Sequence, residues 1–185
     1  AEVHFALGRH RGGERDTAGA IEALERALVL QPDLLPAYPL LGAVRVQAGQ
    51  AEAAARVMAR YEVRLDLLLS ALRNANTVGS RKLAVIDLLA LLDDERATGA
   101  LIDALGDSAP AVRMAAAGAL ADEASAEALM ALSKAALAET DGVARAVLKA
   151  NLKRAHDAAR AALGAPPPAT LPPPTGAPPP AQKDR

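Results

Sequence analysis

Histidine is the residue type that most readily binds a metal or transfers a proton, and the chain has three: His4, His10 and His156. His4 and His10 lie six residues apart, which is not the i, i+4 spacing that places two imidazoles on one helix face for zinc. His156 follows Lys153 and Arg154 near the end of a predicted helix, where a basic side chain interacts favourably with the helix dipole. The histidines therefore predict surface roles, and we expect no metal site.

The carboxylate cluster Asp93-Asp94-Glu95 is the second candidate for chemistry. Because Arg96 follows directly, we interpret the cluster as a helix cap and not as an acid–base pair. The chain has no cysteine, which removes thiol nucleophiles, disulfides and thiolate metal ligands together. It also has no phosphate-binding loop, nucleophile elbow or dinucleotide motif. The sequence therefore predicts a protein that is not an enzyme and that uses no cofactor.

Composition indicates an all-helical fold. The chain has 185 residues, of which 51% are hydrophobic and only 2% aromatic, and it is rich in Ala, Leu and Arg. The formal net charge of -1 gives no bulk positive field for phosphate backbones, so we expect no nucleic-acid partner. Charged residues interrupt every apolar run before it reaches the roughly 18 residues that a membrane span needs.

The N-terminal part carries a repeat. Leu7-Gly8 recurs 34 residues later as Leu41-Gly42, and Ala20 recurs as Ala54. A period near 34 is typical of solenoids of helical hairpins. The pattern resembles the tetratricopeptide repeat, in which small residues such as these let two antiparallel helices approach closely. This resemblance implies two hairpins in residues 1–64, the first with its helices separated by residues 11–14.

The tetratricopeptide resemblance also implies a binding surface. In that family the first helix of each hairpin usually lines the groove. The resemblance therefore predicts four partner-binding residues on these helices: Phe5, Arg9, Ala43 and Gln47. The second unit departs from the family pattern, because Tyr61 and Asp66 occupy the places of its closing Ala and Pro. No Gly or Pro interrupts residues 50–71, yet we expect a break or kink near Asp66, since the packing period changes there.

A second repeat, with a period near 32, follows. Arg81, Arg113 and Arg145 share one register. The pattern predicts three hairpins in residues 65–163, with second helices at about 80–92, 110–121 and 142–158. Pro110 suits a helix start because its fixed φ is helical and its missing N–H is not needed there.

This region resembles short HEAT repeats of the type found in phycobilisome lyases. In that family an Asp in the turn and an Arg six residues later form a ladder of hydrogen bonds between successive hairpins, and Asp107 and Arg113 have this spacing. Glu139 and Arg145 have it too, whereas Ala75 stands six residues before Arg81 and cannot take part. The resemblance implies a structural ladder of at most two rungs.

In HEAT-like arrays the second helix usually lines the inner surface. The resemblance therefore adds Lys82, Met114 and Lys149 to the predicted partner-binding residues. Residues 164–185 contain three Pro-Pro-Pro blocks, and proline removes backbone donors and blocks helical geometry. We predict an extended, disordered tail that acts as a spacer or docks on a partner.

Together these patterns predict a right-handed all-α solenoid of antiparallel hairpins with a Pro-rich tail. The expected function is non-enzymatic: a scaffold for protein–protein interaction, or a structural subunit of a multiprotein assembly. The alternative is a bilin-lyase-like protein that handles tetrapyrroles. The Ala, Leu and Arg content favours a bacterial source, and the absence of Cys with the N-terminal Ala1 favours the bacterial periplasm or envelope over the cytoplasm.

Overall fold

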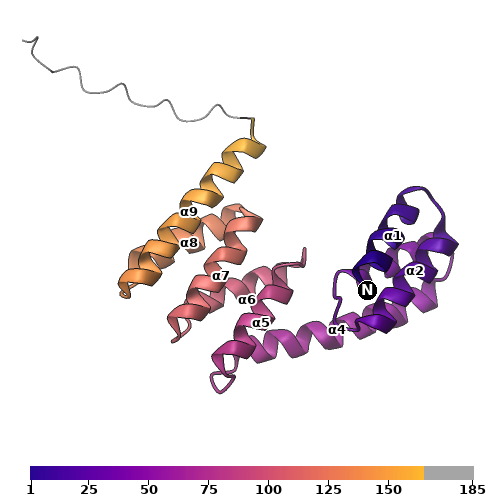
Figure 1. Cartoon of the computed structure of the whole chain (residues 1–185), viewed down its shortest axis with the longest axis horizontal. Coiled ribbons are helices and arrows are strands. Elements are labelled where there is room, and N and C mark those ends of the chain that lie inside the picture. Colours follow the sequence, from indigo (N-terminus) through magenta and orange to yellow (C-terminus); the bar gives the residue numbers. More distant parts are fainter. Residues whose placement is uncertain (165–185) are drawn as a thin grey trace, which may run out of the picture.

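The computed structural model of the chain describes residues 1–164, and this part forms an all-α solenoid (Figure 1). The predicted fold class is confirmed. The helices in chain order are α1 (Glu2–Gly13), α2 (Thr17–Leu30), α3 (Ala37–Gln47), α4 (Ala51–Arg73), α5 (Gly79–Leu89), α6 (Glu95–Ala104), α7 (Pro110–Glu123), α8 (Ala126–Ala138) and α9 (Gly142–Ala162). The predicted tail from residue 165 onward lies outside the described residues. No helix in the described part is both long and apolar enough to cross a membrane.

Local sequence signals fix where most helices begin. Asp16, Ser125 and Asp141 each precede a helix, and each side chain accepts a hydrogen bond from a backbone N–H three residues on. Pro110 is the first residue of α7, as predicted. The first turn differs from the expectation, because α1 continues through Gly12 and Gly13 and the chain turns only at residues 14–16. Two successive glycines therefore do not end this helix.

Helix α4 corrects the prediction of a break near Asp66. It runs for 23 residues without interruption. Its buried side chains recur every three or four residues and so form one apolar row along the whole helix, namely Ala54, Val57, Tyr61, Leu65, Leu69 and Leu72. The packing partner changes along this row, but the helix does not need to bend, because the same face remains buried. The predicted boundary between residues 64 and 65 thus falls inside a helix that both repeat arrays share.

The two arrays meet through α4. Within residues 1–164, helices α1 to α3 pack on one another and on α4, and helices α5 to α9 pack on one another and on α4, with no packing between the two sets. Figure 1 shows α4 as the bar that joins them. On the N-terminal side Arg64 donates to the carbonyl of Pro32 at 3.0 Å. On the other side Tyr61 donates to Asp94 at 3.0 Å.

Close helix approach in the N-terminal array depends on glycine. A Cβ atom built on Gly8 would lie 2.6 Å from Cγ of Leu24, and one on Gly42 would lie 3.1 Å from the sulfur of Met58. Tyr38, which is fully buried, donates its hydroxyl to the carbonyl of Pro32 at 2.8 Å. The Leu-Gly pairs of the sequence repeat thus mark the two places where the hairpin helices touch.

The register of the second array differs from the predicted one in its first hairpin. Aligned on their N-cap residues, α5, α7 and α9 place Lys82, Arg113 and Arg145 at the same position, four residues after the cap. The step from the first hairpin to the second is therefore 31 residues and not 32. The apolar side chains agree with this register, because Val85, which corresponds to Ala116, is buried, whereas Ala84 is exposed.

We expect Gly8→Ala to destabilise the protein by about 1–3 kcal/mol, because the new methyl group must displace the fully buried Leu24. Gly118→Ala is the matched control. Gly118 lies in the middle of α7, and a Cβ placed there would meet nothing within 4 Å, so alanine should stabilise the helix by about 0.5–1 kcal/mol. Urea unfolding measures both, and equal effects of the two changes would contradict the close contact at Gly8.

Candidate functional site

A ladder of ion pairs joins the last three hairpins. Its cations are Lys82 and Arg113, one turn into α5 and α7, and Arg145 occupies the equivalent position in α9 without an ion pair in residues 1–164. Its acids are Asp107 and Glu139, each two residues before the N-cap of the following helix. Lys82 contacts Asp107 at 2.5 Å, which joins the first of these hairpins to the second. Arg113 joins the second hairpin to the third.

The Arg113 rung has the stronger geometry. Nε and Nη2 of Arg113 donate to the two carboxylate oxygens of Glu139 at 2.6 and 2.7 Å. Nη1 donates to the backbone carbonyl of Asp107 at 2.8 Å, so the guanidinium also holds the turn of its own hairpin. The Glu139 side chain is only 3% exposed. A planar, bidentate pair of this kind fixes the orientation of one hairpin on the next.

The environment keeps both ladder acids ionised. The hydrogen bond from Arg113, together with the backbone N–H groups of Asp141 and Thr140, lowers the pKa of Glu139 to about 2. Burial tends to raise the pKa of Asp107, but the hydrogen bonds from Lys82 and the Ala109 N–H outweigh it and leave the pKa lowered.

The pairing within the ladder differs from the one that the sequence suggested. The resemblance implied at most two rungs, built on Asp107, Arg113, Glu139 and Arg145, and two ion pairs between hairpins lie within the described residues. However, Asp107 pairs with Lys82, and Arg113 reaches only the backbone of Asp107. The prediction that Lys82 binds a partner is wrong, because its side chain is 8% exposed and already engaged. The ladder role of Lys82 was missed because the predicted register was wrong by one residue: a uniform period of 32 places Arg81, and not Lys82, at the ladder position.

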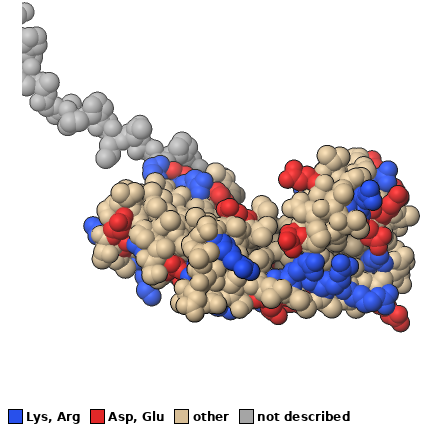
Figure 2. Space-filling view, turned by 60° about the horizontal axis from the view of Figure 1, so that its bottom comes forward, with Lys and Arg blue, Asp and Glu red and all other residues tan. Residues whose placement is uncertain are grey.

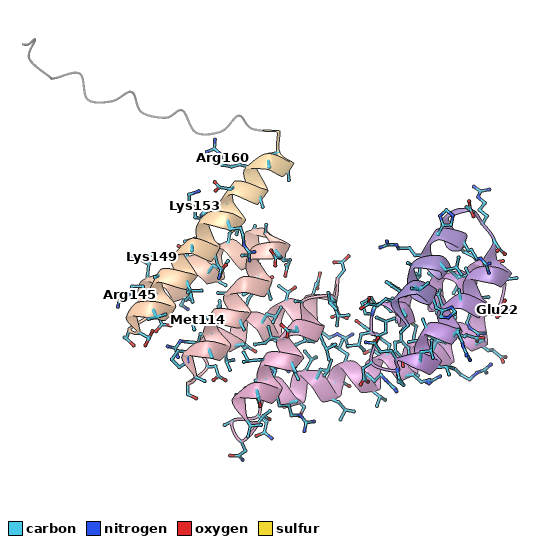
Figure 3. The ribbon with its side chains drawn as sticks, viewed as in Figure 1. Glu22, Met114, Arg145, Lys149, Lys153 and Arg160 are labelled. Atoms are coloured by element: carbon cyan, nitrogen blue, oxygen red, sulfur yellow. The ribbon has the colours of Figure 1, made fainter. Side chains whose placement is uncertain are left out.

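The other predicted partner-binding residues do not form one surface. Phe5 and Met114 are half-buried and pack against the core, whereas Arg9, Ala43, Gln47 and Lys149 are exposed. The N-terminal four lie on α1 and α3, which touch each other. Met114 and Lys149 lie on α7 and α9 in the other array, where Figure 3 labels them.

These predictions missed a groove between α2, α3 and α4. Its volume is about 610 Å³. The lining combines apolar side chains with a band of basic ones, and Figure 2 shows Lys and Arg gathered over this part of the molecule. The basic residues are Arg45, Arg56 and Arg60, and the other lining residues are Glu25, Leu28, Val29, Pro32, Tyr38, Leu41, Ala53 and Val57.

The arginines of the groove differ in how they are engaged. Arg45 pairs with Glu25 and donates to Gln50 at 3.0 Å, while its Nε is buried without a hydrogen-bond partner. Arg56 reaches only Glu52, at 3.9 Å, and Arg60 makes no ion pair within residues 1–164. One feature of the sequence could have indicated this basic band: Arg56 and Arg60 are four residues apart, which places them on one face of α4.

The carboxylate cluster proves to be a cap, as predicted. Asp94 precedes α6 and accepts hydrogen bonds from the backbone N–H and the guanidinium of Arg96. The hydrogen bond from Arg96 is the main cause of its lowered pKa. Tyr61 also donates to Asp94, and burial raises the pKa of this tyrosine to about 12. Asp94 is thus held ionised as a hydrogen-bond acceptor. This suits a role in capping α6 better than a role in proton transfer.

Comparisons with known proteins agree with the second array. Residues 65–153 match the family model of HEAT repeats. Neither the curated proteins nor the solved structures contain a match to the chain. No group of three or more His, Cys, Asp or Glu side chains in residues 1–164 could hold a metal ion. This segment of the chain is therefore HEAT-like.

We expect Glu139→Gln to change the acid unfolding of the protein. The folded pKa of about 2 lies below the ordinary 4.5, so between these values the unfolded chain binds a proton that the folded chain does not. Stability from this group is complete above pH 4.5 and is lost as the pH falls toward 2. The difference in melting temperature between wild type and Glu139→Gln should therefore shrink across this range. Glu127→Gln, on the exposed side of α8, is the control, and a constant difference would refute the ionised rung.

We expect Asp107→Asn to destabilise the protein by about 2–4 kcal/mol, because it leaves the Lys82 ammonium buried with no opposite charge. The double variant Lys82→Met, Asp107→Asn should recover part of this loss, since no charge is then buried. Urea unfolding of the wild type and the single and double variants gives the coupling energy. Strictly additive losses would show that the pair is not coupled.

Proposed function

We propose that the chain is a non-enzymatic module for protein–protein interaction, a scaffold or structural subunit within a larger assembly. HEAT repeats commonly mediate such contacts, and residues 65–153 match them. The tetratricopeptide resemblance of residues 1–64 supports the same function for the N-terminal array. An extended curved surface made of stacked hairpins suits recognition of a macromolecule.

The groove between α2, α3 and α4 carries this proposal. Its apolar lining can receive a side chain of a partner, and Arg56 and Arg60 at its rim have guanidinium groups to offer to carboxylates. We therefore propose a polypeptide partner that carries acidic and apolar residues together. Nothing in the geometry favours the tetrapyrrole alternative, because the only side chain in this groove of the kind expected around a bilin is Tyr38.

The first test is chemical cross-linking with mass spectrometry on protein purified gently from its native source. Reproducible cross-links to another polypeptide are the expected result. A monomer without protein cross-links but with excess mass would instead indicate a bound small molecule and contradict the proposal.

The groove itself is tested by the double variant Arg56→Glu, Arg60→Glu, which should weaken binding of the partner so identified at least tenfold. The matched control is Arg15→Glu, Arg81→Glu. It makes the same change in net charge at two exposed residues, in the turn between α1 and α2 and on α5, outside the groove. Equal loss of affinity in both double variants would show a nonspecific charge effect and remove the groove from the proposal.

A further inference from the structure

We propose that the open face of the last hairpin, α8 and α9, docks a helical hairpin of a protein partner, whose acidic turn supplies a third rung to Arg145. This inference rests on the proposed function as a protein-interaction module, and it identifies the chemistry of one partner. Its basis is a comparison of the last hairpin with the one before it.

Arg145 contacts the same turn carbonyl as Arg113, but through a different nitrogen. Nη1 of Arg113 donates to the carbonyl of the residue six positions before it, Asp107, at 2.8 Å. Nε of Arg145 donates to the carbonyl of the residue six positions before it, Glu139, also at 2.8 Å, so its two Nη nitrogens are the ones left for a carboxylate. The remaining nitrogens of Arg113 bind a carboxylate from the next hairpin. Arg145 makes no ion pair within residues 1–164. It is thus held in position with its carboxylate partner absent.

Leu137 gives an independent sign that a hairpin is missing. It stands two residues before the ladder acid Glu139, as Leu105 stands two residues before Asp107. Leu105 is 8% exposed because it belongs to the core with α7 and α8 around it, whereas Leu137 is 83% exposed. Met130, seven residues earlier and on the same face of α8, is 69% exposed. The apolar and the ionic positions that a following hairpin would cover are therefore both uncovered.

The charge of α9 selects an acidic occupant. From Gly142 to Ala162 the helix has five Lys or Arg residues and one acid, Asp157. Figure 3 shows Arg145, Lys149, Lys153 and Arg160 in a row along the outer edge of α9. Lys149 makes no ion pair within the described residues, while Lys153 pairs with Asp157 at 2.7 Å. A partner with carboxylates near its turn complements this row.

A carboxylate on a protein fits these observations better than a phosphate of nucleic acid. The equivalent cation, Arg113, binds a carboxylate in two-point geometry, and apolar Leu137 and Met130 lie on the same hairpin. Nucleic-acid interfaces are polar and strongly basic, and they do not need such apolar side chains.

The recognition rule is tested by replacing residues 156–163 of the full chain with a copy of residues 124–163, which places the copied Glu139 26 residues after Arg145, as Glu139 stands 26 residues after Arg113. The added copy supplies its own equivalent of Glu139 to Arg145. We expect its helices to form, seen as higher helical circular dichroism, and the melting temperature to rise. In this background, Arg145→Gln and a Glu→Gln change at the added acid should each lower the melting temperature by about 3 °C or more, and together by no more than either alone. Arg81→Gln, at an exposed residue of α5 outside the last hairpin, is the control. An unfolded copy, or additive losses, would overturn the inference.

The partner is tested with a photo-cross-linking amino acid placed at position 137 or at position 60 of the full chain, in its native host. We expect a protein conjugate at position 137, attached near a turn that contains Asp or Glu, and its loss in the Arg145→Glu variant. A conjugate at position 60 only would overturn this inference and leave the proposed function standing. Conjugates at neither position would contradict the proposed function itself.

Two further outcomes of the same experiment would overturn the inference. One is a conjugate with nucleic acid at position 137. The other is a conjugate of position 137 with a second copy of this chain or with its own residues 165–185, among which Asp184 is the one acidic side chain. A variant that ends at Gly164 separates that last case from the others.

Discussion

The apolar row of α4 is the constraint on which the rest of the structure depends. Two sets of helices have no contact with each other in residues 1–164, and both are placed by side chains of this one row. Val57 lies with residues of α2 and α3, Leu72 lies with residues of α5 and α6, and Tyr61 lies between them along α4. Its ring lies 6.5 Å from that of Tyr38, while its hydroxyl binds the cap of α6. A substitution in the middle of α4 therefore affects two cores at once.

Small side chains explain why polar contacts matter so much between the HEAT-like hairpins. Alanines such as Ala100, Ala116, Ala128 and Ala144 are fully buried, and each buries little apolar area. Helices that meet through alanine come close, but their smooth surfaces give little resistance to sliding. Directional pairs such as Arg113 with Glu139 fix the register that apolar packing leaves loosely defined.

Much of this fold was predictable from sequence, for physical reasons that also explain the errors. The Leu-Gly pairs identified close helix contacts correctly, because only glycine fits there. The hairpins of the second array were predicted from the repeated register of Arg81, Arg113 and Arg145, from the spacing of apolar residues and from Pro110 at a helix start. The register around Lys82 was missed, since Arg81 and Leu88 fit a uniform period as well as the true positions do. The continuity of α4 was missed because a change in repeat period does not require a change in backbone direction.

The groove could not be predicted in the same way. Arg45 and Arg60 come from different helices, and only the packing of α3 against α4 brings them to one place. The tetratricopeptide resemblance directed attention to the other faces of the hairpins, where Ala43 and Gln47 are exposed but do not line this groove.

Helix α4 also gives the molecule a definite mechanical character. At 23 residues it is roughly 35 Å long, and it is the single element that carries load between the two arrays in residues 1–164. A pull on one array is transmitted to the other as bending or torsion of this helix, opposed by its backbone hydrogen bonds and by the contacts of Tyr61 and Arg64. The angle between the two arrays is therefore set by the path of α4 and by the contacts that hold it on either side.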